Sequence, residues 1–172
     1  MSKLCVLCAI AGLFAAPGAA WAQSSMMSSA GMGSHAFDWM IGTWNCKNTM
    51  PSAIAGPAVQ MLTATRSSTT GAIIWRYTGK GYDQYGFLSY VPKTGTWWFS
   101  WAYPGGSIGN ESTKQPGKKM IWTGLIFDTS TGKSMHIRDT YTMYGLTKFN
   151  DLGEDDSTGT MKPSYNGTCV KT

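Results

Sequence analysis

The sequence is poor in the residues that most hydrolases use for catalysis. It contains two histidines, nine acidic residues, and neither a G-x-S-x-G nor an H-E-x-x-H motif. A serine hydrolase needs a nucleophile beside a base, and a zinc peptidase of that motif needs paired histidines. The composition therefore argues against a hydrolytic triad. No metal or cofactor is expected, because no histidine stands in a haem-binding context.

Concentrated positive charge is also missing. Fourteen Lys and Arg residues oppose nine Asp and Glu residues, and only Lys118 and Lys119 are adjacent. A protein that follows a phosphate backbone needs a basic stripe or patch. Nucleic acid is therefore not an expected partner.

Long apolar runs are absent after the N-terminus. One basic residue precedes an apolar run at 4–16, and an Ala-x-Ala site ends at Ala22. This pattern is typical of a secretory signal peptide, and the run is too short for a retained membrane span. We predict a signal peptide at 1–22, cleavage after Ala22, and a mature protein that is periplasmic or secreted.

The rest of the chain has the length of one domain. Residues 23–36 are rich in Ser, Gly and Met without any periodicity, which predicts a flexible lead-in. Residues 37–172 then form a single domain. Within it only Cys46 and Cys169 remain, and two cysteines in an oxidising compartment suggest one disulfide. A metal or redox pair is less favoured, since neither belongs to a C-x-x-C motif or has a histidine nearby.

The domain reads as antiparallel β-structure. Short runs rich in Val, Ile, Thr, Tyr and Trp are separated by Gly, Pro, Asn and Asp, and no segment after Ile41 has a helical period. The predicted strands are 43–49, 58–67, 72–78, 82–91, 96–103, 107–113, 118–127, 134–143, 146–149 and 159–170, the last bent near Pro163. This pattern predicts an all-β fold, a single up-and-down barrel of eight to ten strands with little helix.

Closure of the sheet is favoured over a sandwich. In a closed barrel the first and last strands are neighbours, so Cys46 and Cys169 would bridge the seam. The immunoglobulin-type spacing of Cys, Trp and Cys is absent. The acidic run of Asp151, Glu154, Asp155 and Asp156 is predicted as a turn and solvated hairpin tip, because it lacks the spacing of a calcium-binding loop.

The stretch at 37–46, F-D-W-M-I-G-T-W-N-C, begins the domain. Phe37, Met40 and Ile41 have the spacing of one apolar-faced helical turn, after which Gly42 lets the backbone enter a strand. The Trp-x-x-Gly-Thr-Trp-x-Cys run resembles the opening of lipocalin-like (calycin) proteins, above all small secreted families. The resemblance implies an up-and-down barrel whose closed end is plugged by Trp44.

Aromatic residues are abundant, with eight Trp, eight Tyr and six Phe. In the run at 96–103, strand alternation places four aromatic rings on one face. Core packing with rings on the outer wall explains such residues, and so does a cavity for a flat or extended apolar ligand. We predict the ligand-lining rings as Trp75, Tyr77, Trp97, Phe99, Trp101 and Trp122.

One strand, at 134–141, carries a polar cluster. Ser134, His136, Arg138 and Thr140 share one face, and Met135, Ile137, Asp139 and Tyr141 share the other. If the first face points inward, Arg138 and His136 become polar anchors for a ligand, and this is the arrangement we predict. If it points outward, they are solvent-exposed groups. The lipocalin resemblance implies a third placement, with Arg138 packed over Trp44.

Two functional hypotheses follow for the interior. The first is binding of a small hydrophobic or aromatic molecule. The second is a cofactor-independent lyase or isomerase acting on a phenolic or polyene substrate, with His136, Arg138, Asp139 and Tyr141 as candidate catalytic groups. A third hypothesis is that aromatic residues on the outer wall contact a partner protein or an envelope polymer.

Overall fold

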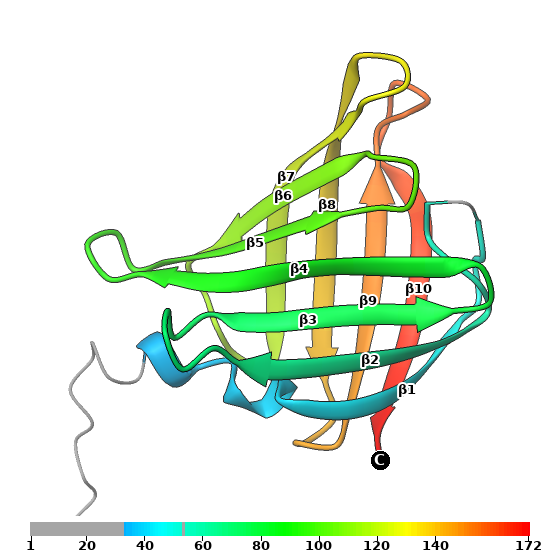
Figure 1. The fold of residues 1–172 in the computed structure, drawn as a ribbon. Coiled ribbons are helices and arrows are strands. Elements are labelled where there is room, and N and C mark those ends of the chain that lie inside the picture. The colour runs from blue at the N-terminus through cyan, green and yellow to red at the C-terminus, as the bar shows by residue number, and fades with distance from the viewer. Residues whose placement is uncertain (1–32, 53) are drawn as a thin grey trace, which may run out of the picture.

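Ten antiparallel strands form one closed barrel in this computed structural model, which describes residues 33–52 and 54–172. Each strand pairs with the next along the chain, and β10 closes onto β1 (Figure 1). The strands are β1 (Gly42–Asn48), β2 (Val59–Arg66), β3 (Ile73–Gly79), β4 (Tyr82–Val91), β5 (Thr96–Ala102), β6 (Ile108–Thr113), β7 (Lys119–Asp128), β8 (Lys133–Met143), β9 (Lys148–Asp155) and β10 (Lys162–Lys171). The predicted all-β, up-and-down barrel is confirmed.

The predicted signal peptide at 1–22 and most of the predicted lead-in at 23–36 lie outside the described residues. Within the described part, no helix has the length and apolar character that a membrane crossing requires.

Strand alternation separates an interior face from an exterior face. In β4, buried and exposed residues alternate from Tyr82 to Leu88, and β3 alternates in the same way. Short turns join the strands, as at Lys80-Gly81, where Gly81 has a φ of 68° that other residues rarely adopt. In each strand, every second side chain therefore fills the barrel, and the side chains between them face solvent.

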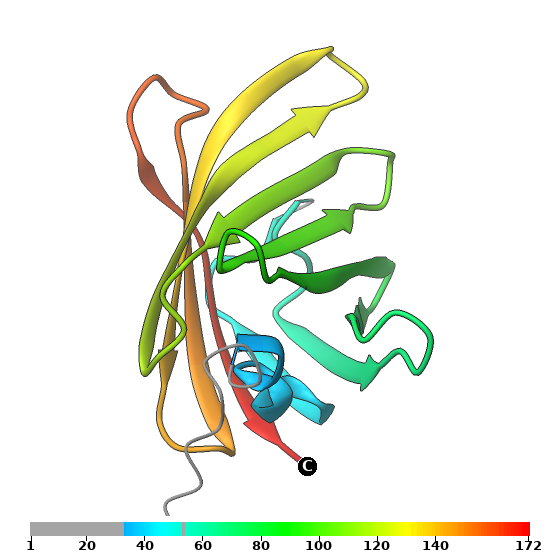
Figure 2. The same ribbon diagram turned by 90° about the vertical axis from the view of Figure 1, so that its left-hand side faces the viewer.

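A short 3-10 helix, η1 (Asp38–Met40), lies across one end of the barrel (Figure 2). Behind it Trp44 is fully buried, and its indole N–H donates to the Met40 carbonyl over 2.8 Å. The Lys171 ammonium lies 5.0 Å from the centre of the Trp44 ring, a cation–π contact. The apolar turn before Gly42 and the place of Trp44 at the closed end are thus as expected. The cation over the ring is Lys171, so the placement of Arg138 there is wrong.

A disulfide joins Cys46 and Cys169 at the seam of the barrel, as predicted. The two residues are direct partners in the β1–β10 register, so their side chains point to the same face. A structural disulfide is consistent with an extracellular or periplasmic location.

The late strands differ from the prediction in one place. Strand β9 continues to Asp155, so the predicted turn at 151–153 is wrong. Of the acidic run, only Asp156 lies in the turn between β9 and β10. Asp151 and Gly153 follow Phe149 at alternate positions and are buried inside the barrel. The bend predicted near Pro163 is confirmed as a register shift between Pro163 and Tyr165.

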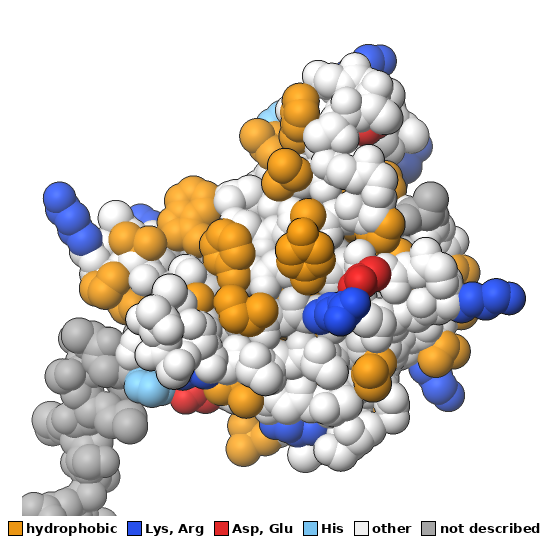
Figure 3. All heavy atoms as spheres, in the orientation of Figure 1, with side chains coloured by type: hydrophobic (Ala, Val, Ile, Leu, Met, Phe, Trp, Pro, Cys, Tyr) orange, Lys and Arg blue, Asp and Glu red, His pale blue; other side chains and the backbone are white. Residues whose placement is uncertain are grey.

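Hydrophobic side chains also lie on the outer wall, where they gather over β4 and β5 (Figure 3). Tyr85, Phe87 and Trp98 are exposed there. These side chains point away from the barrel, whereas those of Trp75, Phe99 and Trp101 point inward. The abundance of aromatic residues therefore has two origins, an aromatic interior and an aromatic outer patch.

Candidate functional site

The barrel interior is filled at one end and hollow at the other. Near η1, a small void beside Phe37, Leu88 and Trp122 is too narrow for a water molecule. Towards the opposite end lies a cavity of about 140 Å³. One water molecule needs roughly 10–15 Å³ of such space, so the cavity has room for a small organic molecule.

Aromatic rings form much of the cavity wall. Phe99 is central, with its ring centre 4.9 Å from that of Trp75 and 5.2 Å from that of Trp101. Tyr77 packs edge-on against Trp75 at 5.5 Å, and Tyr141 lies 6.4 Å from Phe99. These rings come from β3, β5 and β8, so the wall is assembled from strands far apart in the sequence. Such a wall suits a flat apolar body.

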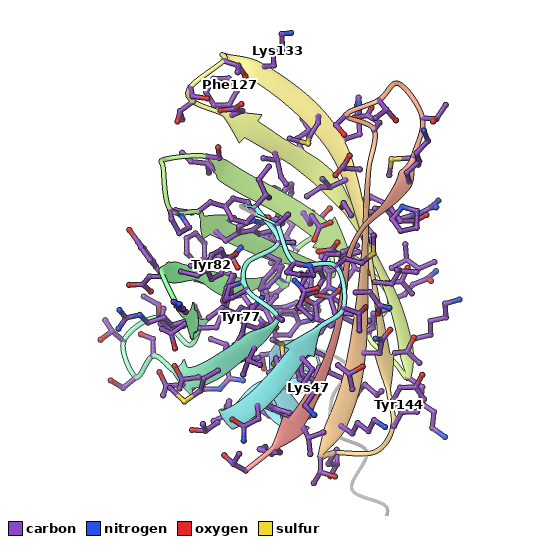
Figure 4. The ribbon with its side chains drawn as sticks, turned by 90° about the vertical axis from the view of Figure 1, so that its right-hand side faces the viewer. Lys47, Tyr77, Tyr82, Phe127, Lys133 and Tyr144 are labelled. Carbon is purple, nitrogen blue, oxygen red and sulfur yellow. A yellow bond between two sulfur atoms is a disulfide. The ribbon has the colours of Figure 1, made fainter. Side chains whose placement is uncertain are left out.

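The connection between β1 and β2 lies at the mouth of the cavity. Gln60 donates from its side-chain amide to the Ala55 carbonyl over 2.9 Å, and the Tyr82 hydroxyl donates to the Ile54 carbonyl over 3.0 Å. Figure 4 shows Tyr77 and Tyr82 inside the barrel behind this connection, whereas Lys133 lies at the tip of the β7–β8 hairpin. Polar side chains of the barrel wall thus hold part of the mouth in place.

Three acidic side chains point into the same interior, Glu111 on β6, Asp139 on β8 and Asp151 on β9. Asp139 and Asp151 line the cavity, and Glu111 lies behind Asp139, fully buried. Gly153 leaves space for this cluster, since a Cβ there would lie 2.8 Å from an Asp139 oxygen. The cluster therefore depends on a glycine in a neighbouring strand.

Burial and mutual repulsion keep protons on these carboxyl groups. Burial raises the pKa of Asp139 to about 7, and the charge of Glu154 adds to the effect. The pKa of Glu111 is also raised, by burial first and then by the charges of Asp139 and Asp151. For Asp151, burial and the charge of Asp139 again raise the pKa. A proton held by Glu111 or Asp139 can form a hydrogen bond between them.

Several polar atoms in this region have no protein partner. Asp151 Oδ1 is buried without a hydrogen bond, and so is the indole N–H of Trp75. Buried polar groups in native proteins almost always have a partner, whether protein, water or ligand. Asp151 and Trp75 line the cavity, so a molecule inside it can reach both.

The predicted ligand-lining rings fall into two groups. Trp75, Tyr77, Phe99 and Trp101 line the cavity. Trp97 and Trp122 lie deeper, against Phe37 at the filled end, with ring centres 4.7 Å and 5.3 Å from it. The first four are in reach of a ligand, and the other two form the floor.

The predicted polar anchors face the other way. His136 and Arg138 lie on the outer wall, so their inward orientation is wrong. His136 Nδ1 lies 2.8 Å from Asp156, and Arg138 Nε donates to Glu154 over 2.7 Å. The other face of β8, with Asp139 and Tyr141, points inward instead, because Ile137 and Tyr141 on that face bury apolar surface.

The interior acids Glu111 and Asp151 were missed from the sequence. Glu111 and Thr113 lie two residues apart on a correctly predicted strand and therefore share one face. This shared face was a signal that could have found Glu111. Asp151 was missed because its strand was ended too early. In a sequence, a buried carboxyl group on a strand is hard to distinguish from an exposed one unless it is known which face of the strand points inward.

Among the described residues, no three His, Cys, Asp or Glu side chains are placed to share one metal ion. A comparison with protein-family models finds no match, and neither does a comparison with curated proteins. The geometry of the cavity is therefore the basis for the functional argument.

Proposed function

We propose that this chain is an exported, lipocalin-like protein that binds a small aromatic or hydrophobic molecule inside its barrel. One observation carries the proposal, namely a cavity in which buried polar atoms of Trp75 and Asp151 have no protein partner. Leaving such an atom unpaired costs about 1–3 kcal/mol, and a ligand that pairs with it recovers that cost. The aromatic wall supplies the apolar contact area.

Native mass spectrometry of the mature protein, purified from its own exported fraction, tests the proposal. We expect a stoichiometric small molecule that is released on denaturation. Trp101→Ala should lower its occupancy at least about tenfold, because the ring is a large part of the cavity wall.

Trp98→Ala is the matched control, since Trp98 lies on the same strand but on the outer wall. It should retain the ligand. An empty wild-type protein, or equal occupancy in both variants, would contradict the proposal.

A second candidate function is a cofactor-independent lyase or isomerase in the same cavity. It is favoured by Asp139, whose pKa is raised by burial to about 7, close to that of an efficient general base. Tyr141 lies on the same face of β8 and lines the same cavity. An isomerase of this kind needs one group that takes a proton from one carbon and returns it to another. His136 and Arg138, on the outer wall, have no part in it.

For this candidate, we expect Asp139→Asn to slow turnover by roughly 10²–10⁴-fold while binding persists. The assay follows product formation from a panel of phenolic and polyene compounds by mass spectrometry. Arg138→Ala should turn over like the wild type, because its guanidinium pairs with Glu154 outside the barrel. Unchanged compounds with the wild-type protein, or equal turnover by Asp139→Asn, would leave binding as the function.

A further inference from the structure

The charged groups around the cavity all have the same sign. Asp139, Asp151, Glu154 and Asp155 line it, and no lysine, arginine or histidine of the described residues does. Arg138, the neighbour of Asp139 on β8, lies on the outer wall and is already paired with Glu154. The interior therefore has carboxylates without a counter-charge.

One oxygen of these carboxyl groups lies at the cavity without a protein partner. Asp151 is only 5 % exposed, lines the cavity, and its Oδ1 accepts no hydrogen bond. Glu111, behind Asp139, is fully buried, and its carboxyl group lies against that of Asp139. A buried carboxylate of this kind is stable only if it holds a proton or meets a cation.

The surrounding rings also favour a cation. Trp75, Phe99 and Tyr141 present aromatic surface close to the acids, and the faces of such rings attract ammonium groups. Carboxylates combined with aromatic faces are the usual surroundings of a bound organic amine, whereas a carboxylate ligand would be repelled.

We propose that the cavity binds a small organic cation, an amine or amidine on an aromatic or aliphatic body, with its charge beside Asp139 and Asp151. This inference rests on the proposed binding function and specifies its ligand class. The ligand's N–H groups donate to the unpartnered oxygen of Asp151, and its body lies against Trp75, Phe99 and Trp101.

Binding of a cation must displace protons from the acids. The acidic groups that face Asp139 are Glu111 on β6 and Asp151 and Glu154 on β9. The tyrosines that face it are Tyr77 on β3, Tyr103 just after β5, Tyr141 on β8 and Tyr165 on β10. Burial raises the pKa of each of these four tyrosines, so they stay neutral. The affinity for a cation should therefore rise from pH 6 to pH 8, as the carboxyl groups lose their protons more readily.

The test is calorimetry with three amines and their alcohol counterparts, namely benzylamine, 2-phenylethylamine and tryptamine, with phenylacetate as an anion. We expect the best amine to bind at least about tenfold more tightly than its alcohol, and phenylacetate to bind most weakly. Proton release should appear as a dependence of the binding heat on the ionisation enthalpy of the buffer.

Asp151→Asn should remove most of the preference for the amine, and Glu111→Gln should reduce it. Asp83→Asn is the matched control, because Asp83 pairs with Arg76 on the outer wall and changes the net charge equally. An alcohol that binds as tightly as its amine, or an amine affinity that falls from pH 6 to pH 8, would overturn the cation inference and leave cavity binding intact. If the barrel binds no probe of any charge and releases no molecule, both proposals fail.

Discussion

Replacing Cys46 and Cys169 together with alanine is expected to lower the free energy of unfolding by about 4–5 kcal/mol. The two cysteines are 123 residues apart in sequence, so the bridge closes nearly the whole barrel into one loop. In the chain-entropy treatment a loop of this length restricts the unfolded chain by about that amount. Typical domains have a total stability of only about 5–15 kcal/mol, so the loss is large.

Urea denaturation of the variant and of the oxidised wild type measures this difference. The wild type with reductant is the matched control and should unfold like the variant, whereas reductant should not affect the variant itself. A difference below about 1 kcal/mol would mean that the strand pairing of β1 with β10 closes the barrel without help from the bridge.

The second large effect is on the pH dependence of stability. The pKa of Asp139 is raised by burial to about 7, against an ordinary value of 3.8 in the unfolded chain. Between these values the folded protein holds a proton that the unfolded chain has lost, so stability falls as pH rises. The slope is about 1.4 kcal/mol per pH unit for one such group, and the fall from pH 4.5 to pH 7 is about 3 kcal/mol.

The buried neighbours act in the same direction, because burial also raises the pKa of Glu111 and of Asp151. Surface carboxyl groups act in a different range. Hydrogen bonds from Ser130 and Thr131 lower the pKa of Asp128 to about 2, so its contribution is lost only as pH falls below about 4. We therefore expect maximal stability near pH 4–5 rather than at neutral pH.

Urea denaturation between pH 4.5 and pH 7.5 tests this expectation. Asp139→Asn should have a shallower slope than the wild type, because the variant lacks one titrating group. Asp83→Asn should keep the wild-type slope, because Asp83 is exposed and paired with Arg76. A free energy of unfolding that is constant or rises across this range would show that the interior acids are ionised and already paired.

The fold was largely predictable because its signals are local. Strand alternation, turn residues and the 37–46 stretch each depend on neighbours in the chain, and ten strands form where eight to ten were expected. The pairing of the two cysteines was also predictable, because only two remain after the predicted leader. The error at β9 has a local cause too, since Asp151 and Gly153 are typical turn residues that tertiary packing placed in a strand.

The site was harder to predict, because it depends on which face of each strand points inward. Alternation groups His136 with Arg138 and Asp139 with Tyr141, but a one-residue change of register exchanges the two faces. In β8 the choice followed from burial of Ile137 and Tyr141. Outside the barrel, Arg138 pairs with Glu154 on β9, and His136 pairs with Asp156 just after that strand. No local pattern contains that information.

The sequence by itself determined the strand order, the closed-end stretch around Trp44 and the one possible disulfide of the described domain, because each follows from residue types and spacing. Only the tertiary structure decided what the barrel contains. It brought Glu111, Asp139 and Asp151 together from three strands, and it placed His136 and Arg138 outside. The physical reason is that a buried carboxyl cluster depends on contacts across the sheet, which exist only once the barrel has closed.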